Sequence, residues 1–102
     1  MQQADFAFGS IEEAKIVAEL MGLKSAQALK IISRFGGVPA LVDALHSIGH
    51  EIRRETVYKW TYAATVRCKG GTGGIIPRPR RMSIEKAAYK LGIQLTNEDW
   101  SE

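Results

Sequence analysis

The sequence predicts a compact all-α domain of about five short helices with an extra N-terminal helix. Three observations support this fold class. Apolar residues recur at helical spacing in one short segment after another, and glycines or capping residues separate these segments. No stretch reads clearly as a strand except "TVRC" at 65–68. With 102 residues, 45% apolar and 25% charged, the chain has the length and composition of one modest globular domain.

The first predicted helix covers residues 11–21. Ser10 with Glu13 forms a capping-box signature before it, and Gly22 suits its end. We interpret residues 1–24 as an N-terminal helical extension and residues 25–102 as the main domain. The apolar face of this helix is expected to bury against the domain or a second subunit, and it consists of Ile11, Ala14, Val17 and Met21.

Two further helices are predicted at 26–35 and 38–49. Ser25 can cap the first of them, and Gly36-Gly37 ends it. Pro39 lies in the first turn of the second, where its missing N–H does no harm. The expected core-facing residues are Leu29, Ile32 and Phe35 in the first helix, and Val38, Leu41, Val42 and Leu45 in the second.

The segment "IRRETVYKW", residues 52–60, predicts a short helix with one apolar side. Val57 and Trp60 are three residues apart and would anchor that side in the core. The polar face would consist of Arg53, Arg54, Glu55, Tyr58 and Lys59.

The remainder of the chain predicts a glycine-rich connection and one longer helix. Residues 63–76 lack helical periodicity, and their glycines would let the backbone turn. Pro77 begins a helix over 77–92 that ends at Gly92. Its expected core residues are Met82, Ala88 or Tyr89, and Leu91. Thr96 with Asp99 predicts a capped last turn at 97–100.

The charges are distributed unevenly along the chain. Residues 1–50 hold four Lys/Arg against five Asp/Glu, whereas residues 52–81 hold eight Lys/Arg against Glu55 alone. Such an asymmetry favours a polyanionic partner, although a solvated basic loop would give the same pattern.

Two short helices separated by a turn, the second with a basic face, are the general form of a helix-turn-helix. An arginine at the start of the second helix can contact guanine through O6 and N7, and Lys59 can reach a phosphate. Helix pairs of this kind are also common in all-α proteins that bind no DNA.

The chain also resembles the small Cro-type and YdaS-like helix-turn-helix proteins of phages and prophages. The resemblance covers residues 26–100 and rests on "RFGGVPALVDAL", "RRETVYKWTY", "GGTGGIIPRPR" and "IEKAAYKLGIQLTNEDW" in that order. It departs from the family pattern in the longer turn "HSIGHEIRRETV" and in the N-terminal helix. By position, residues 40–45 match the positioning helix and residues 53–60 the recognition helix.

The resemblance implies sequence-specific binding of double-stranded DNA by a homodimer, usually to repress a promoter. Base readout is then expected from Arg53, Arg54, Glu55 and Tyr58. Phosphate contacts are expected from the backbone N–H groups at the Gly37–Val38 helix start and from Lys59, Arg67, Lys69, Arg34, Arg78, Arg80 and Arg81. The alternative is an antitoxin or protein-binding adaptor that uses the N-terminal helix.

Other chemistries have weaker support. His46, His50 and Cys68 fall short of a four-ligand zinc site, so we expect no metal. "KGGTGG" lacks the Gly-Lys-Ser/Thr of a phosphate loop, and we find no catalytic set, so we expect no enzyme, cofactor or small-molecule substrate. The N-terminal helix is too acidic for anionic lipid. One cysteine and the lack of a long apolar run favour a cytoplasmic protein without a membrane segment.

Overall fold

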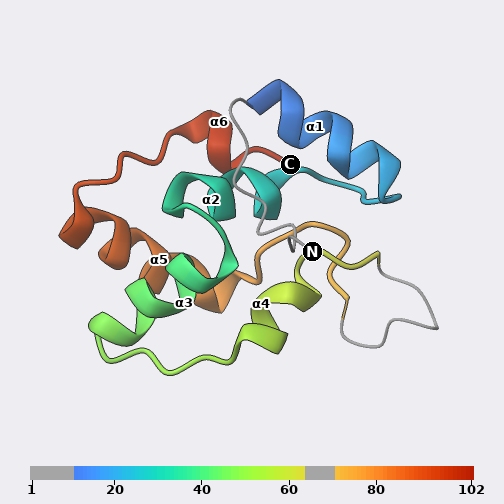
Figure 1. Cartoon of the computed structure of the whole chain (residues 1–102). Coiled ribbons are helices and arrows are strands. Elements are labelled where there is room, and N and C mark those ends of the chain that lie inside the picture. Colours follow the sequence, from blue (N-terminus) through green and yellow to red (C-terminus); the bar gives the residue numbers. More distant parts are fainter. Residues whose placement is uncertain (1–10, 64–70) are drawn as a thin grey trace.

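The computed structural model of the chain describes residues 11–63 and 71–102, and its described part is built from helices without strands. The all-α fold class predicted from the sequence is thus confirmed. The helices are α1 (Ile11–Leu20), α2 (Gln27–Phe35), α3 (Val38–Ser47), α4 (Arg54–Lys59), α5 (Arg78–Leu91) and α6 (Asn97–Trp100) (Figure 1).

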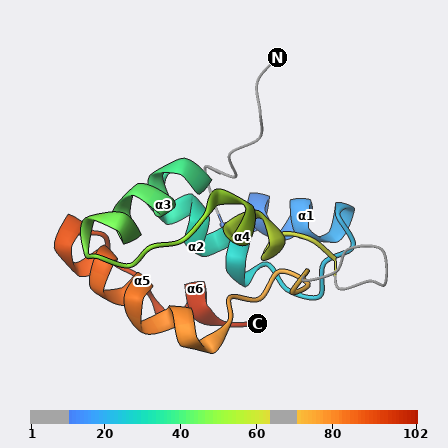
Figure 2. The same ribbon diagram turned by 90° about the horizontal axis from the view of Figure 1, so that it is seen from below.

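Helix α2 lies at the centre of the arrangement. It contacts α1, α3 and α6, while α3 also packs against α4 and α5. In both Figure 1 and Figure 2, α1 lies on one side of the molecule and α5 on the other. Helix α4 lies between these two sides, at the lower edge of Figure 1.

The main core forms where α2, α3, α4 and α5 meet. Every core-facing residue predicted for α2 and α3 is buried. Leu29 faces away from this main core and packs with Ala14 and Ala18 of α1 in a second, smaller cluster. The buried side chains of the main core are Ala28, Ile31, Ile32, Phe35, Val38, Leu41, Val42, Ala44, Leu45, Ile52, Val57, Trp60, Ile76, Ile84, Ala87 and Ala88.

Helix α1 does bury a face against the domain, but this face is narrower than predicted. It consists of two alanines, Ala14 and Ala18, with Val17 packed beside them. Met21 was expected on it and is instead exposed, because it follows the end of the helix at Leu20. The side chain of Ile11 lies outside the described residues.

The prediction for the core face of α5 was wrong at two positions. Met82 and Leu91 are exposed, and Ile84, Ala87 and Ala88 are buried instead. The helix carries two apolar stripes on opposite sides, and the stripe with the smaller side chains fits against α3. Leu91 belongs to the last turn of α5, where it is exposed at the end of the packed surface.

A buried glutamine fastens three parts of the domain together. Gln27 is fully buried, and its amide nitrogen donates to the backbone oxygen of Trp100 at 2.6 Å. Its amide oxygen accepts from the backbone N–H of Ile76 at 2.8 Å. Because a buried amide needs its partners, Gln27 fixes the positions of residues 71–76 and α6 relative to α2.

The glycine-rich segment continues this attachment. The backbone oxygen of Gly73 accepts from the N–H groups of Lys24 and Ser25, and that of Gly74 accepts from Ala28 at 2.8 Å. Both glycines are buried. These two glycines therefore pack against the start of α2 and are not exposed for contact with a partner.

The capping box predicted at Thr96 and Asp99 is present. At α2 the N-cap is Ala26 and not Ser25, although the Ser25 hydroxyl accepts from the backbone N–H of Gln27 at 3.0 Å. The Ser10–Glu13 signature and the "TVRC" stretch rest on residues outside the described ranges.

One lysine is buried between α2 and the C-terminal segment. The Lys30 amine donates to the backbone oxygens of Glu98 and Ser101 and to the Ser101 hydroxyl, at 2.6, 3.2 and 3.2 Å. Burial lowers the pKa of Lys30, and the nearby Lys15 ammonium lowers it further.

In residues 11–63 and 71–102, no helix has the length and apolar character needed to cross a membrane.

Candidate nucleic-acid interface

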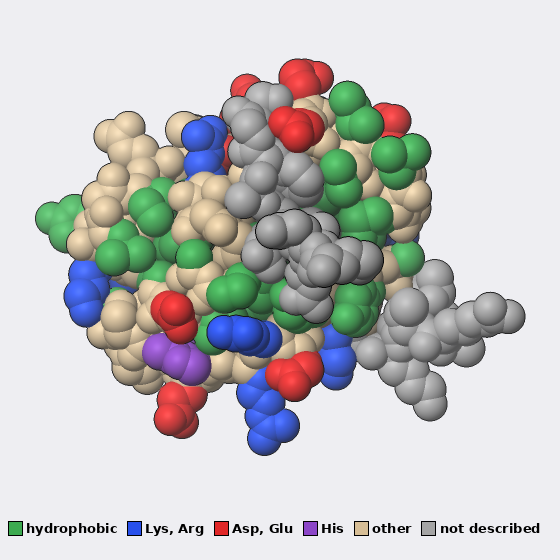
Figure 3. Space-filling model, in the orientation of Figure 1, with side chains coloured by type: hydrophobic (Ala, Val, Ile, Leu, Met, Phe, Trp, Pro, Cys, Tyr) green, Lys and Arg blue, Asp and Glu red, His purple; other side chains and the backbone are tan. Residues whose placement is uncertain are grey.

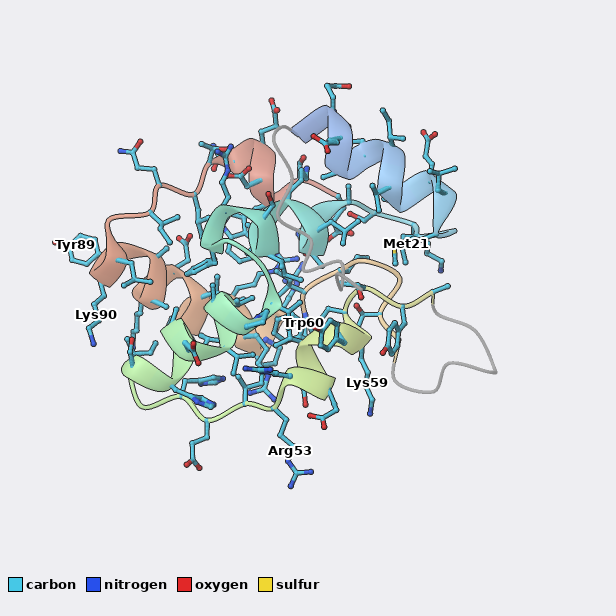
Figure 4. The ribbon with its side chains drawn as sticks, in the orientation of Figure 1. Met21, Arg53, Lys59, Trp60, Tyr89 and Lys90 are labelled. Atoms are coloured by element: carbon cyan, nitrogen blue, oxygen red, sulfur yellow. The ribbon has the colours of Figure 1, made fainter. Side chains whose placement is uncertain are left out.

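Helix α4 has one buried side and one exposed side, as its spacing predicts. Val57 and Trp60 are both buried in the main core. The exposed residues are Arg53, Arg54, Glu55 and Lys59, and Tyr58 is half-buried against the core. Figure 4 shows Arg53 and Lys59 projecting from the same edge of the molecule, on the side of α4 away from Trp60.

The helix begins later than predicted, at Arg54 instead of at residue 52. Arg53 has an extended backbone, with φ −93° and ψ 151°, and occupies the N-cap position. Ile52 is buried in the core, and its backbone oxygen lies 2.8 Å from the Nε2 atom of His46. The core and His46 thus hold residue 52 outside the helix, which places Arg53 and Arg54 at its start.

A second histidine fixes the connection between α3 and α4 to α5. The Nη1 atom of Arg80 lies 2.9 Å from Nε2 of His50, and the Ser83 hydroxyl lies 3.1 Å from Nδ1. Through these two contacts, His50 holds the turn before α4 against the first turns of α5.

The end of α4 is fixed by the segment that follows the glycine-rich connection. The backbone N–H of Thr72 donates to the oxygen of Lys59 at 3.1 Å, and its hydroxyl lies between the backbone oxygens of Ile75, at 2.5 Å, and Trp60, at 3.2 Å. The buried Thr61 hydroxyl donates to the oxygen of Tyr58 at 2.6 Å. The exposed face of α4 is therefore presented from a helix that is held at both ends.

The predicted phosphate-binding residues separate into three groups. Lys59 and Arg78 are exposed, and Arg67 and Lys69 lie outside the described residues. The other three each have a partner within the chain, and they are Arg34, Arg80 and Arg81.

The partner of Arg34 is the fully buried Asp99. The Nε atom of Arg34 lies 3.1 Å from both carboxylate oxygens of Asp99, so the pair joins α2 to α6. The guanidinium of Arg81 lies 5.5 Å from the centre of the Trp100 ring and pairs with Glu102 at 3.4 Å. These contacts give both arginines a structural role, and their predicted phosphate contacts would have to compete with it.

The start of α3, predicted to bind a phosphate through its backbone N–H groups, is buried. Gly37 and Val38 are both buried, so a phosphate has no open path to their N–H groups.

Around α4, the surface is mixed in charge: Figure 3 shows Lys and Arg side chains at this edge next to acidic and histidine side chains. The acidic residues beside α4 include Glu51 and Glu55, both exposed.

One hollow formed by the described residues lies away from α4. It has a volume of about 320 Å³ and is lined by residues of α1, the segment 23–26, Lys30, Ser101 and Glu102. Lysines and glutamates both line it, and the Lys30 amine is already bonded to three oxygens. Among the residues that the structure describes, no group of three His, Cys, Asp or Glu could hold a metal ion.

Comparison with protein-family models, with curated proteins and with solved structures found no match to this chain. Sequence reasoning found the two faces of α4 but missed the residues that hold it, namely His46, His50, Ser83 and Thr72. Both histidines lie within eight residues of Arg54 in the sequence, and that proximity was a signal for their role in the turn.

Proposed function

We propose that this protein binds double-stranded DNA through the exposed face of α4 and regulates transcription, as a repressor in a cytoplasmic setting. The observation that carries the proposal is α4 itself. Its inner side is buried through Val57 and Trp60, and two arginines stand exposed at its start. A helix held in this way can enter the major groove with its first residues at the base edges.

The chemistry of the exposed residues supports this use. Arg53 and Arg54 can each donate two hydrogen bonds to guanine, and Lys59 can neutralise a phosphate. At six residues α4 is short, so base contacts would be concentrated at its first turn. The resemblance to phage helix-turn-helix proteins supports the same function and suggests a homodimer.

The test compares two arginine variants with a distant lysine variant. Arg53→Ala and Arg54→Ala are measured against a selected DNA site, its single-base variants and random DNA. Loss of a guanine contact should cost about 1–3 kcal/mol on the selected site and relax the preference at one base pair. Lys15→Ala on α1 removes the same charge far from α4 and should leave base preference unchanged.

The salt dependence provides a second readout. The logarithm of affinity should fall against the logarithm of salt with a slope of roughly −4 to −8 for two bound copies. A flat slope, or loss of cognate and random affinity in equal proportion for both arginine variants, would remove the basis for base readout by Arg53 and Arg54.

A protein-binding adaptor is the second candidate, because α1 leaves Ile16 and Leu20 exposed. The two candidates differ in a simple observation. A regulator of the proposed kind shifts its DNA in a gel when it is alone, whereas an adaptor needs its protein partner.

A further inference from the structure

The outer face of α1 is apolar along its middle and acidic at its margins. Ile16 and Leu20 are 58% and 82% exposed, on the side of the helix opposite Ala14 and Ala18. Glu12 and Glu19 lie beside them at helical spacing and are also exposed, with the Lys15 amine 3.9 Å from Glu12 on the same margin. Figure 3 shows hydrophobic and acidic side chains next to one another over this helix.

The outer face of α5 has the same kind of apolar stripe with the opposite charge. Met82 and Tyr89 are 69% and 89% exposed and lie two turns apart on one side of the helix. Arg78 and Lys86 lie beside them and are exposed. The one acid of this helix, Glu85, already accepts a hydrogen bond from the Trp100 indole at 3.1 Å.

These two faces point away from one another. In Figure 1 and Figure 2, α1 and α5 lie on opposite sides of the molecule, and Figure 4 shows Tyr89 projecting outward at the far end of α5. One copy of the chain therefore cannot bring its own two faces together. A second copy can.

We infer that copies of this chain associate head to tail, with the outer face of α1 from one copy on the outer face of α5 from the next. Charge decides between this contact and the symmetric ones. Two α1 faces would place Glu12 and Glu19 against other glutamates, and two α5 faces would place Arg78 and Lys86 against other cations. Only the contact between α1 and α5 places charges of opposite sign next to one another around the apolar side chains.

The helix lengths allow this pairing. Ten residues make α1 about 15 Å long and fourteen make α5 about 21 Å long, so the shorter helix can lie along the longer one. Burial of Ile16, Leu20 and Met82 would supply the apolar part of the contact. A pair of helices gives a small interface, so the association is weak and grows with concentration. A head-to-tail contact also leaves one free face at each end, so it can continue beyond two copies.

The test uses two charge-reversed variants, without DNA, so its outcome is independent of the proposed DNA binding. One variant carries Glu12→Lys with Glu19→Lys, and the other carries Arg78→Glu with Lys86→Glu. Sedimentation equilibrium at low salt measures the mass against concentration, and circular dichroism confirms that each variant is folded. Each variant alone then has two faces of like charge, and its association should fall at least about tenfold.

An equimolar mixture of the two variants should regain association, because each variant supplies the face that the other repels. This restoration distinguishes a direct contact from damage to the fold. A wild-type protein that stays monomeric at all concentrations would overturn the proposal. So would a closed dimer that the Arg78 and Lys86 changes leave intact, since that dimer would use α1 symmetrically.

Discussion

Trp60 and Arg54 show the difference between the buried side of α4 and its exposed side. Trp60→Ala empties a buried aromatic site in the main core and should cost about 3 kcal/mol or more of the free energy of unfolding. Arg54→Ala removes an exposed side chain and should leave this free energy nearly unchanged. Urea unfolding of both variants measures the difference. If Trp60→Ala unfolds like the wild type, the orientation of α4 is wrong.

Lys30 gives the protein a distinct dependence of stability on pH. Burial and Lys15 lower its folded-state pKa below the ordinary value of 10.5, so the folded chain releases this proton before the unfolded chain does. Between the lowered pKa and 10.5 the unfolded state binds more protons, and the contribution of Lys30 to stability rises with pH.

The measurement is urea unfolding of the wild type and of Lys30→Met over this alkaline range. The stability of the wild type relative to the variant should increase as the pH approaches 10.5. Lys24→Met, at an exposed lysine, is the matched control. A relative stability that falls with pH for Lys30→Met would contradict the stated effect of burial.

Single residues also mark the limit of the sequence prediction. Val57 and Trp60 were assignable to the core because a local period of three to four residues determines which side of a helix they share. The ion pair between Arg34 and Asp99 joins residues 65 positions apart, and no local pattern indicates such a contact. Arg34 was therefore predicted as a phosphate contact from its charge alone.

At the element scale, the segment 71–76 is part of the scaffold that supports α2 and α4. A Cβ atom on Gly74 would lie 2.0 Å from the backbone oxygen of Ser25, and the φ of Gly74 is +91°. Gly74→Ala should therefore lower the free energy of unfolding by about 3 kcal/mol, from the clash together with the strained backbone.

Gly49→Ala is the matched control for this prediction. Its φ is +81°, but nothing lies within 4 Å of an added Cβ, so only the backbone strain of about 1 kcal/mol remains. Thermal or urea unfolding of both variants gives the comparison. Equal losses would mean that the segment yields easily and does not hold the start of α2.

The helices themselves were largely predictable, and the errors have a common cause. Glycines and capping residues located the ends of α2, α5 and α6 to within a residue or so. The start of α4 was placed too early because Ile52 fits a helical period but packs into the core beside His46. In α5, Met82 was expected in the core, whereas α3 packs against the side of the helix that carries Ile84, Ala87 and Ala88.

At the scale of the whole molecule, the proposed DNA binding and the proposed association make a joint prediction about the DNA site. A two-fold dimer requires inverted half-sites, because its two recognition helices run in opposite senses along the duplex. A head-to-tail contact has no two-fold axis, so adjacent copies would present α4 in the same sense and favour direct repeats. For two copies to reach the major groove from the same side of the duplex, their sites must lie about one helical turn apart, roughly 10 base pairs, or a multiple of it.

Selection of bound sequences from a random DNA pool measures this arrangement directly. The wild type should enrich a short motif repeated in the same orientation about one helical turn apart. The variant with Glu12→Lys and Glu19→Lys keeps α4 intact but loses the contact between copies, so it should enrich the same motif singly. Inverted repeats from the wild type would contradict the head-to-tail contact while leaving DNA binding by α4 in place. Failure to enrich any motif would instead count against the recognition role of Arg53 and Arg54, because base readout at the start of α4 is what gives the selection its sequence preference.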